Sequence, residues 1–207
     1  MNRGTPAVES VKENAGPMPS RLRALAEIAG TAAAFALASS FSSLFQQASG
    51  ASYLFAPAAV IFAASIAFGI RGVAGVALGT LFERWGGAST PVGAVAFMLV
   101  HGVTAGIGAW MLRTPVGGSG RRLQRVFAYG CLLPNLWSAI AGPLVLAGLG
   151  FIPRTVAAVI DTGLPWWMSD IAATCVLGAP LLLLLRPEAL LTPADIDLMR
   201  DWLRRVF

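Results

Sequence analysis

Long apolar runs separated by short loops make up most of this chain and limit what it can fold into. About six runs can be distinguished, and they cover roughly residues 25–45, 54–70, 73–85, 91–112, 126–151 and 165–185. A helix needs roughly 20 apolar residues to cross the hydrocarbon core of a bilayer. Because 56% of the residues are hydrophobic and only 12% are charged, an ordinary soluble domain could not bury them. We therefore predict an all-α fold, a polytopic transmembrane helical bundle of about six helices in contact with the lipid bilayer.

The positions of the 15 Lys and Arg residues test this arrangement, because cytoplasmic loops are enriched in them. If all the runs span, only Arg84 and Arg154 fall on the outer side. The third run is short, but without it the basic loop around 113–125 would also fall on the outer side. The distribution therefore predicts that the third run spans and that both termini are cytoplasmic. This topology, together with anionic lipid headgroups, accounts for the net charge of +5 without nucleic acid.

Three segments are expected: a disordered cytoplasmic tail over 1–20, the transmembrane bundle over 21–186 and a cytoplasmic amphipathic helix over 187–207. The first apolar run is interpreted as a retained signal anchor. The last helix has a start signal in Thr192, Pro193 and Asp195, which suit the N-cap, the first position and the first turn. Its apolar residues recur at helical spacing. Two interpretations stay open: a helix lying on the inner leaflet, or a docking helix for a partner protein.

Polar side chains inside the apolar runs are the candidate binding residues, because ionisable groups at membrane depth are costly. Asp170 follows Trp166 and Trp167 near the expected outer end of the sixth run. His101, the only histidine, lies near the middle of the fourth run, and Asn135 follows Pro134 in the fifth. We predict that these five polar and aromatic residues form a polar floor beneath an aromatic rim. A purely structural role, as interhelical hydrogen bonds or an interface carboxylate, remains open for Asp170, His101 and Asn135.

The residue inventory does not suggest an enzyme. One histidine without a suitably spaced Cys or Asp provides no nucleophile and base pair, so no catalytic residue is predicted. No metal site is expected either, because Cys131 and Cys175 lie singly in apolar runs, and no cofactor is expected. Glycines in the third and fourth runs are interpreted as helix-packing positions, with a substrate path lined by small residues as the alternative.

Several motifs resemble the bacterial membrane-associated sensor domains of the MASE type, first class. They are the aromatic, proline and small-residue stretch 55–69, the glycine-containing run 72–81, the stretch 138–143, Trp166-Trp-Met-Ser-Asp170 and Gly178-Ala-Pro-Leu181. The resemblance covers about residues 25–185. The chain departs from the family pattern at Ala59, Ser169 and Ala173, where the family has glycine. The last helices of the family's usual region and any output domain are not expected in this chain.

The resemblance implies a stand-alone sensor-like module in the bacterial inner membrane that binds an unknown cue. It further implies signal transduction through a partner in trans, a histidine kinase or cyclic-di-GMP enzyme, and a homo-oligomer is a further expectation. Two other functions stay open from sequence alone. One is the substrate-binding subunit of a vitamin-type transporter, and the other is a structural subunit of a membrane assembly.

Overall fold

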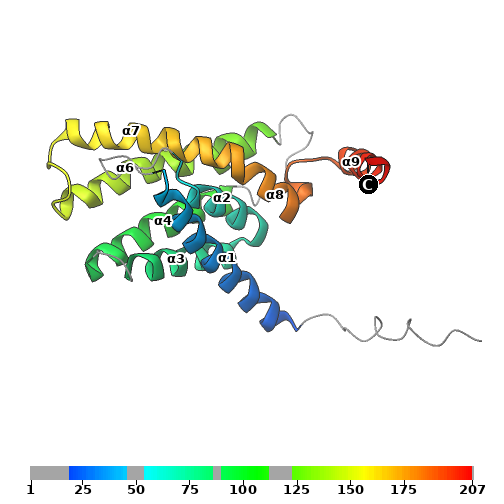
Figure 1. Ribbon diagram of the computed structural model, residues 1–207, viewed down its shortest axis with the longest axis horizontal. Helices are drawn as coiled ribbons and strands as arrows, with labels where there is room; N and C mark the ends of the chain where they lie inside the picture. Colours follow the sequence, from blue (N-terminus) through cyan, green and yellow to red (C-terminus); the bar gives the residue numbers. More distant parts are fainter. Residues whose placement is uncertain (1–18, 46–53, 86–89, 112–122, 207) are drawn as a thin grey trace, which may run out of the picture.

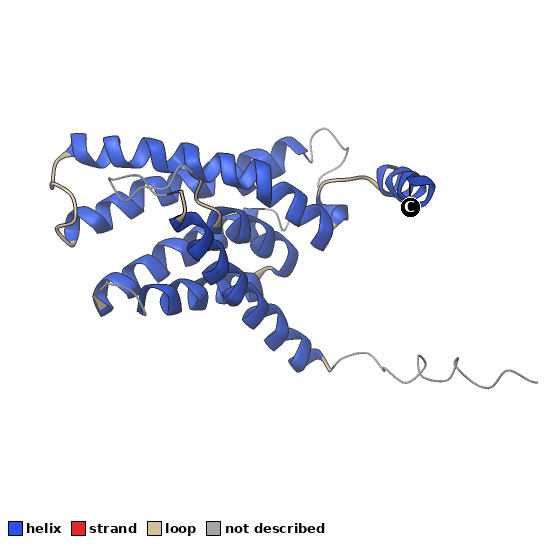
Figure 2. Cartoon of the chain, viewed as in Figure 1, coloured by secondary structure: helices blue, strands red, loops and turns tan. Residues whose placement is uncertain are grey.

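The computed structural model describes residues 19–45, 54–85, 90–111 and 123–206, and these are helical with short connections (Figure 2). No strand occurs in these ranges, so the predicted all-α bundle is confirmed. The tail predicted at 1–20, apart from its last two residues, lies outside the described ranges. Four helical segments are long and apolar enough to cross a membrane: Ser20–Ser43, Pro91–Met111, Leu123–Gly148 and Val156–Leu185.

The elements run in the order α1 to α9 (Figure 1). Their bounds are α1 Ser20–Ser43, α2 Pro57–Phe68, α3 Ile70–Trp85, α4 Pro91–Met111, the π-helical segment η2 Val126–Leu132, α6 Leu133–Gly148, α7 Val156–Ala173, the π-helical segment η3 Thr174–Gly178, α8 Ala179–Leu185, the short 3-10 helix η4 Pro187–Ala189 and α9 Pro193–Val206. The segment η2 runs directly into α6, and η3 joins α7 to α8, so each forms part of one long span.

The second and third apolar runs form a tight helical pair. Gly69 separates α2 from α3 and has a φ of 58°, a left-handed conformation that favours glycine. Gly72 of α3 then packs directly on the Ala64 carbonyl of α2. Because α2 has only 12 residues and a helix rises about 1.5 Å per residue, it is shorter than a hydrocarbon core of about 30 Å.

The short helix α2 lies at the centre of the bundle, and nearly all of its residues are buried. Val60 and Ile61 pack with Phe35 of α1, Val76 of α3 and Ala105 of α4. Its other side forms a second core cluster with η2 and α8. Helices therefore surround α2, which explains why its apolar residues follow no one-sided pattern.

Contacts between helix ends show which ends lie together. Glu27 of α1 forms ion pairs with Arg23 and with Arg71 of α3, both at 2.9 Å. Arg186, after α8, donates to the Ile66 carbonyl of α2 at 2.9 Å. These arginines define what we call the basic end of the bundle. Away from it, the Ser42 hydroxyl accepts from the Ala56 N–H at 2.8 Å.

One expected boundary is wrong, and two prolines do not interrupt their helix. The sixth span begins at Val156 rather than near Pro165, and Pro165 lies inside α7. Thr155 caps this helix by accepting from the Ala158 N–H at 3.2 Å, a stronger start signal than the proline. In the fifth span, Pro134 and Pro143 do not break the helix. The chain instead widens into the π-helical segment η2 before Pro134 and continues through Pro143.

Candidate functional site

A buried carboxyl group with an unpaired oxygen atom lies on α7. Asp170 is 1% exposed, and its Oδ1 atom makes no hydrogen bond among the described residues. Two polar side chains lie next to this carboxyl. They are Ser138, on α6, and Trp166, one turn earlier on α7. The Ser138 Oγ and Trp166 Nε1 atoms are also buried without a partner. Three adjacent polar groups therefore keep unused hydrogen-bonding capacity, which is costly in a buried setting.

The close approach of α6 and α7 brings these groups together. Pro143 has no N–H, so the Ala139 carbonyl loses its helical donor. Gly163 of α7 packs directly against that carbonyl. At Gly142, a Cβ atom would lie 2.8 Å from the Trp166 ring. The two glycines and the proline therefore place the Trp166 indole of α7 against α6, the helix that carries Ser138.

His101 is buried on α4 among aromatic rings. Its Nδ1 lies 3.2 Å from the Thr80 hydroxyl of α3, and its Nε2 has no partner among the described residues. The ring centroid lies 5.5 Å from that of Phe35, 5.8 Å from that of Phe55 and 6.2 Å from that of Phe97. The Thr80 hydroxyl also donates to the Val76 carbonyl at 2.9 Å, so it can be the acceptor for an Nδ1–H group.

Two phenylalanines connect the histidine to the tryptophan. The ring of Trp166 stacks on that of Phe97, with 6.3 Å between the ring centroids and an interplanar angle of 17°. It packs edge-on against the ring of Phe55, also with 6.3 Å between the centroids. The Arg84 guanidinium lies 4.5 Å from the centroid of the Phe97 ring, a cation–π distance. We call this set the polar–aromatic cluster, and it consists of Phe55, Phe97, His101, Ser138, Trp166 and Asp170.

The cluster thus brings together three of the five predicted residues, His101, Trp166 and Asp170. Sequence reasoning missed Phe55, Phe97 and Ser138. Phe55 stands directly before the proline-containing stretch of α2, and Ser138 lies three residues after Asn135, on the same side of α6. Spacing could therefore have suggested Ser138, but the two phenylalanines look like any other apolar residue of a span.

Asn135 lies outside the cluster, toward the basic end. Its Nδ2 donates to the Thr174 hydroxyl at 3.2 Å and lies 3.9 Å from the Cys131 sulfur. Thr174 is the first residue of η3, and Asn135 follows closely after η2. This hydrogen bond therefore links the two long spans where each contains a π-helical segment, a feature that often occurs at functional sites.

Trp167 points away from the cluster and donates its Nε1–H to the Leu132 carbonyl at 3.3 Å. The aromatic rim at the outer end of the sixth span stays a prediction. Because α7 begins at Val156, Trp166 and Trp167 lie well inside the helix and are partly buried in contacts between helices.

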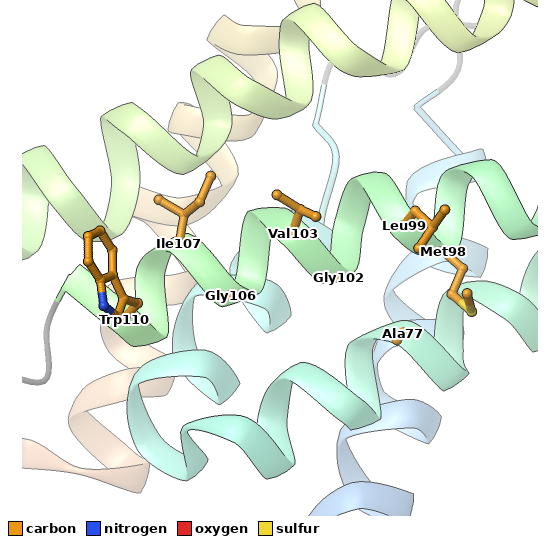
Figure 3. A pocket seen from close by; sticks show the side chains of 8 residues that line it. All are labelled: Ala77, Met98, Leu99, Gly102, Val103, Gly106, Ile107 and Trp110. Atoms are coloured by element: carbon orange, nitrogen blue, oxygen red, sulfur yellow. The ribbon is translucent and has the colours of Figure 1, made fainter.

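An apolar groove lies on the outer surface of α4, separate from these residues (Figure 3). Its volume is ≈ 490 Å³, and it lies between Ala77 of α3 and one face of α4. The remaining lining residues are Met98, Leu99, Gly102, Val103, Gly106, Ile107 and Trp110. Trp110 is 68% exposed, so this surface faces outward.

Comparisons with known proteins agree with the helical membrane architecture. A family model described as MASE1 matches residues 24–198, which is most of the chain. No curated protein and no solved structure matches the chain. In the described ranges, no three His, Cys, Asp or Glu side chains come together as metal ligands would.

Because the family model matches most of its length and its helices are long and apolar enough to span a membrane, the chain belongs to the MASE1 family of membrane-associated sensor domains.

Proposed function

We propose that this chain is a bacterial inner-membrane sensor module that receives its cue at the polar–aromatic cluster and signals through a partner protein. In this proposal both termini are cytoplasmic, with the basic end of the bundle at the cytoplasmic face. The charge distribution supports this orientation, because Arg23, Arg71 and Arg186 gather at that end. The chain carries out no catalysis in this proposal, and the partner supplies the enzymatic output.

The observation that carries the proposal is the unused hydrogen-bonding capacity at Asp170. An ionisable group in a membrane span is a functional candidate because its insertion is costly, by about 2.5–3.5 kcal/mol at a helix centre. Here the Ser138 and Trp166 side chains lie next to the buried carboxyl, yet the Asp170 Oδ1, Ser138 Oγ and Trp166 Nε1 atoms make no hydrogen bond within 3.5 Å. A helix-packing role alone would favour paired groups, as found for Asn135 and Thr174.

The same spans offer a route from the cluster to the basic end. Asp170 on α7 precedes η3, and Ser138 on α6 follows η2. A change at the cluster that shifts α6 against α7 would act on the Asn135–Thr174 hydrogen bond between the two π-helical segments. Both spans then continue to the basic end, where we place the partner.

The first experiment is affinity purification of the full chain from its native membrane in detergent, followed by mass spectrometry of co-eluting proteins and small molecules. A histidine kinase or cyclic-di-GMP enzyme in the eluate supports the sensor function. An ATPase pair with a bound metabolite would instead assign the chain to a transporter. Co-elution with a stable membrane assembly and no small molecule would favour a structural subunit.

The site itself is tested by Asp170→Asn, with Asp161→Asn as the matched control. Both aspartates lie on α7, but Asp161 is exposed. We expect Asp170→Asn to abolish the response of the captured partner enzyme while membrane insertion is retained, and Asp161→Asn to respond like the wild type. A normal response in Asp170→Asn would exclude the cluster as the cue site. Loss of insertion in this variant alone would assign Asp170 a structural role.

A further inference from the structure

The last helix, α9, is specified locally and begins abruptly. The Thr192 hydroxyl accepts from the Asp195 N–H at 3.3 Å, and the Asp195 carboxylate accepts from the Thr192 N–H at 3.0 Å. This reciprocal pair is a capping box, and Pro193 occupies the first helical position. The Thr192 hydroxyl and N–H, both donating to the carboxylate, lower the pKa of Asp195. The helix therefore starts at Pro193 without support from the bundle.

One side of α9 presents large apolar side chains that the rest of the described chain does not cover. Leu198 is 72% exposed, and Trp202, one turn later, is 59% exposed. Asp197 and Arg200 form an ion pair on the other side, at 3.7 Å. Among the described elements, the main neighbour of α9 is the short helix η4. A helix with separate apolar and charged sides binds at the boundary between water and acyl chains.

The chain holds α9 at the basic end of the bundle. Arg186 is tied to the Ile66 carbonyl, and Ala189 and Leu190 pack against the core cluster that contains Phe62 and Leu182. Only a short link then leads to Pro193. In Figure 1, α9 stands apart from the bundle and is seen nearly end-on, whereas α3, α4, α6 and α7 run along the page. The helix is thus turned across the spans, as a helix lying in the plane of the membrane would be.

The charges at this end fit an anionic surface. The helix α9 carries three exposed aspartates, Asp195, Asp197 and Asp201, and three exposed arginines, Arg200, Arg204 and Arg205. Its excess of positive charge therefore lies in the C-terminal half, with Arg204 and Arg205 in the last turn. Arg23 and Arg71, at the start of α1 and α3, add positive charge at the basic end, offset in part by Glu27, with which both form ion pairs. Anionic headgroups attract basic segments that lie next to the membrane.

We propose that α9 binds the anionic surface of the inner leaflet, with Leu198 and Trp202 in the acyl-chain boundary and its arginines on the headgroups. This interaction fixes the direction in which the C-terminal segment leaves the bundle. It does not depend on the cue site, because no residue of the polar–aromatic cluster takes part.

Spin-label accessibility in the full chain tests this directly. The chain, with both native cysteines replaced by alanine, is reconstituted at one copy per vesicle in phosphatidylcholine, with or without 30% phosphatidylglycerol. Labels are placed by Trp202→Cys on the apolar side and by Asp197→Cys on the charged side. With phosphatidylglycerol present, we expect the label at 202 to collide with membrane-dissolved oxygen. Its collision rate with an aqueous nickel chelate should be at least fivefold lower than that of the label at 197.

A triple variant separates charge from simple apolar burial. In Arg200→Gln, Arg204→Gln and Arg205→Gln, the shielding at 202 should fall at least threefold in anionic vesicles. Equal exposure of both labels to the nickel chelate in anionic vesicles would refute the proposal. Shielding at 202 that needs several copies per vesicle would also refute it, since a second copy and not lipid would then cover the helix. Shielding of the same size without phosphatidylglycerol would overturn the anionic preference.

Discussion

The two sides of α4 contain the same kinds of residues but have different surroundings. On the inner side, His101 and Phe97 are buried in the polar–aromatic cluster, and Gly108 lies against Ser65 of α2. On the outer side, Gly106 has nothing within 4 Å of where its Cβ would be, and the apolar groove opens there. Glycine in a membrane helix therefore does not by itself mark a packing contact. Only its neighbours decide whether it allows a close approach or leaves a hollow.

The largest effect is expected where a glycine meets backbone. Gly72→Ala would push a Cβ atom into the Ala64 carbonyl of α2, which cannot move like a side chain. We expect a loss of about 3 kcal/mol or more of unfolding free energy, at the upper end for overpacking. The measurement is the temperature at which the buried Cys131 thiol reacts with a maleimide dye, in a Cys175→Ser background. Unchanged thermal stability would show that α2 and α3 are not in such close contact.

A second, smaller effect is expected at the contact between α3 and the inner side of α4. Thr80→Val keeps the shape of the side chain but removes the hydroxyl next to His101 Nδ1. Leaving a buried polar group unpaired costs about 1–3 kcal/mol. The same Cys131 assay should show a lower unfolding temperature, whereas Thr80→Ser should keep most of the wild-type stability. If the valine and serine variants are equally stable, the hydrogen bond contributes nothing.

The smallest effect is expected on the outer side of α4. Gly106→Ala adds a methyl group where no atom lies within 4 Å, and alanine favours helix by up to about 1 kcal/mol over glycine. The unfolding temperature should stay the same or rise slightly. The matched variant Gly108→Ala, with Ser65 Oγ 3.2 Å from the added Cβ, should be less stable than Gly106→Ala. The reverse order would mean that another molecule fills the outer groove.

Much of the fold could be predicted from sequence because the bilayer leaves few choices. Apolar runs of sufficient length must be helices, since every backbone group needs a partner inside the membrane. The capping signal of α9, at Thr192 and Asp195, is local and was predicted correctly. The start of α7 was missed because Thr155 is a short-range cap in an unremarkable stretch, whereas Pro165 is a conspicuous but tolerated helix residue.

The candidate site could be predicted only in part. His101, Trp166 and Asp170 stand out because polar groups and tryptophans are rare in apolar runs, and the structure brings them together. Trp167 and Asn135 stand out equally, yet they bond to Leu132 and Thr174 outside the cluster. Adjacent residues on a helix point about 100° apart, so neighbouring tryptophans can serve different contacts.

The sequence by itself determined the number of apolar runs, the family and the amphipathic last helix, because hydropathy, motif order and capping act over short distances. Tertiary structure alone decided that α2 lies buried at the centre, that Phe55 and Phe97 join His101 to Trp166, and that Gly106 stays open while Gly72 is packed. These outcomes depend on which helices come into contact and how each is rotated. Rotation follows from the packing of all the helices together, which no single run specifies.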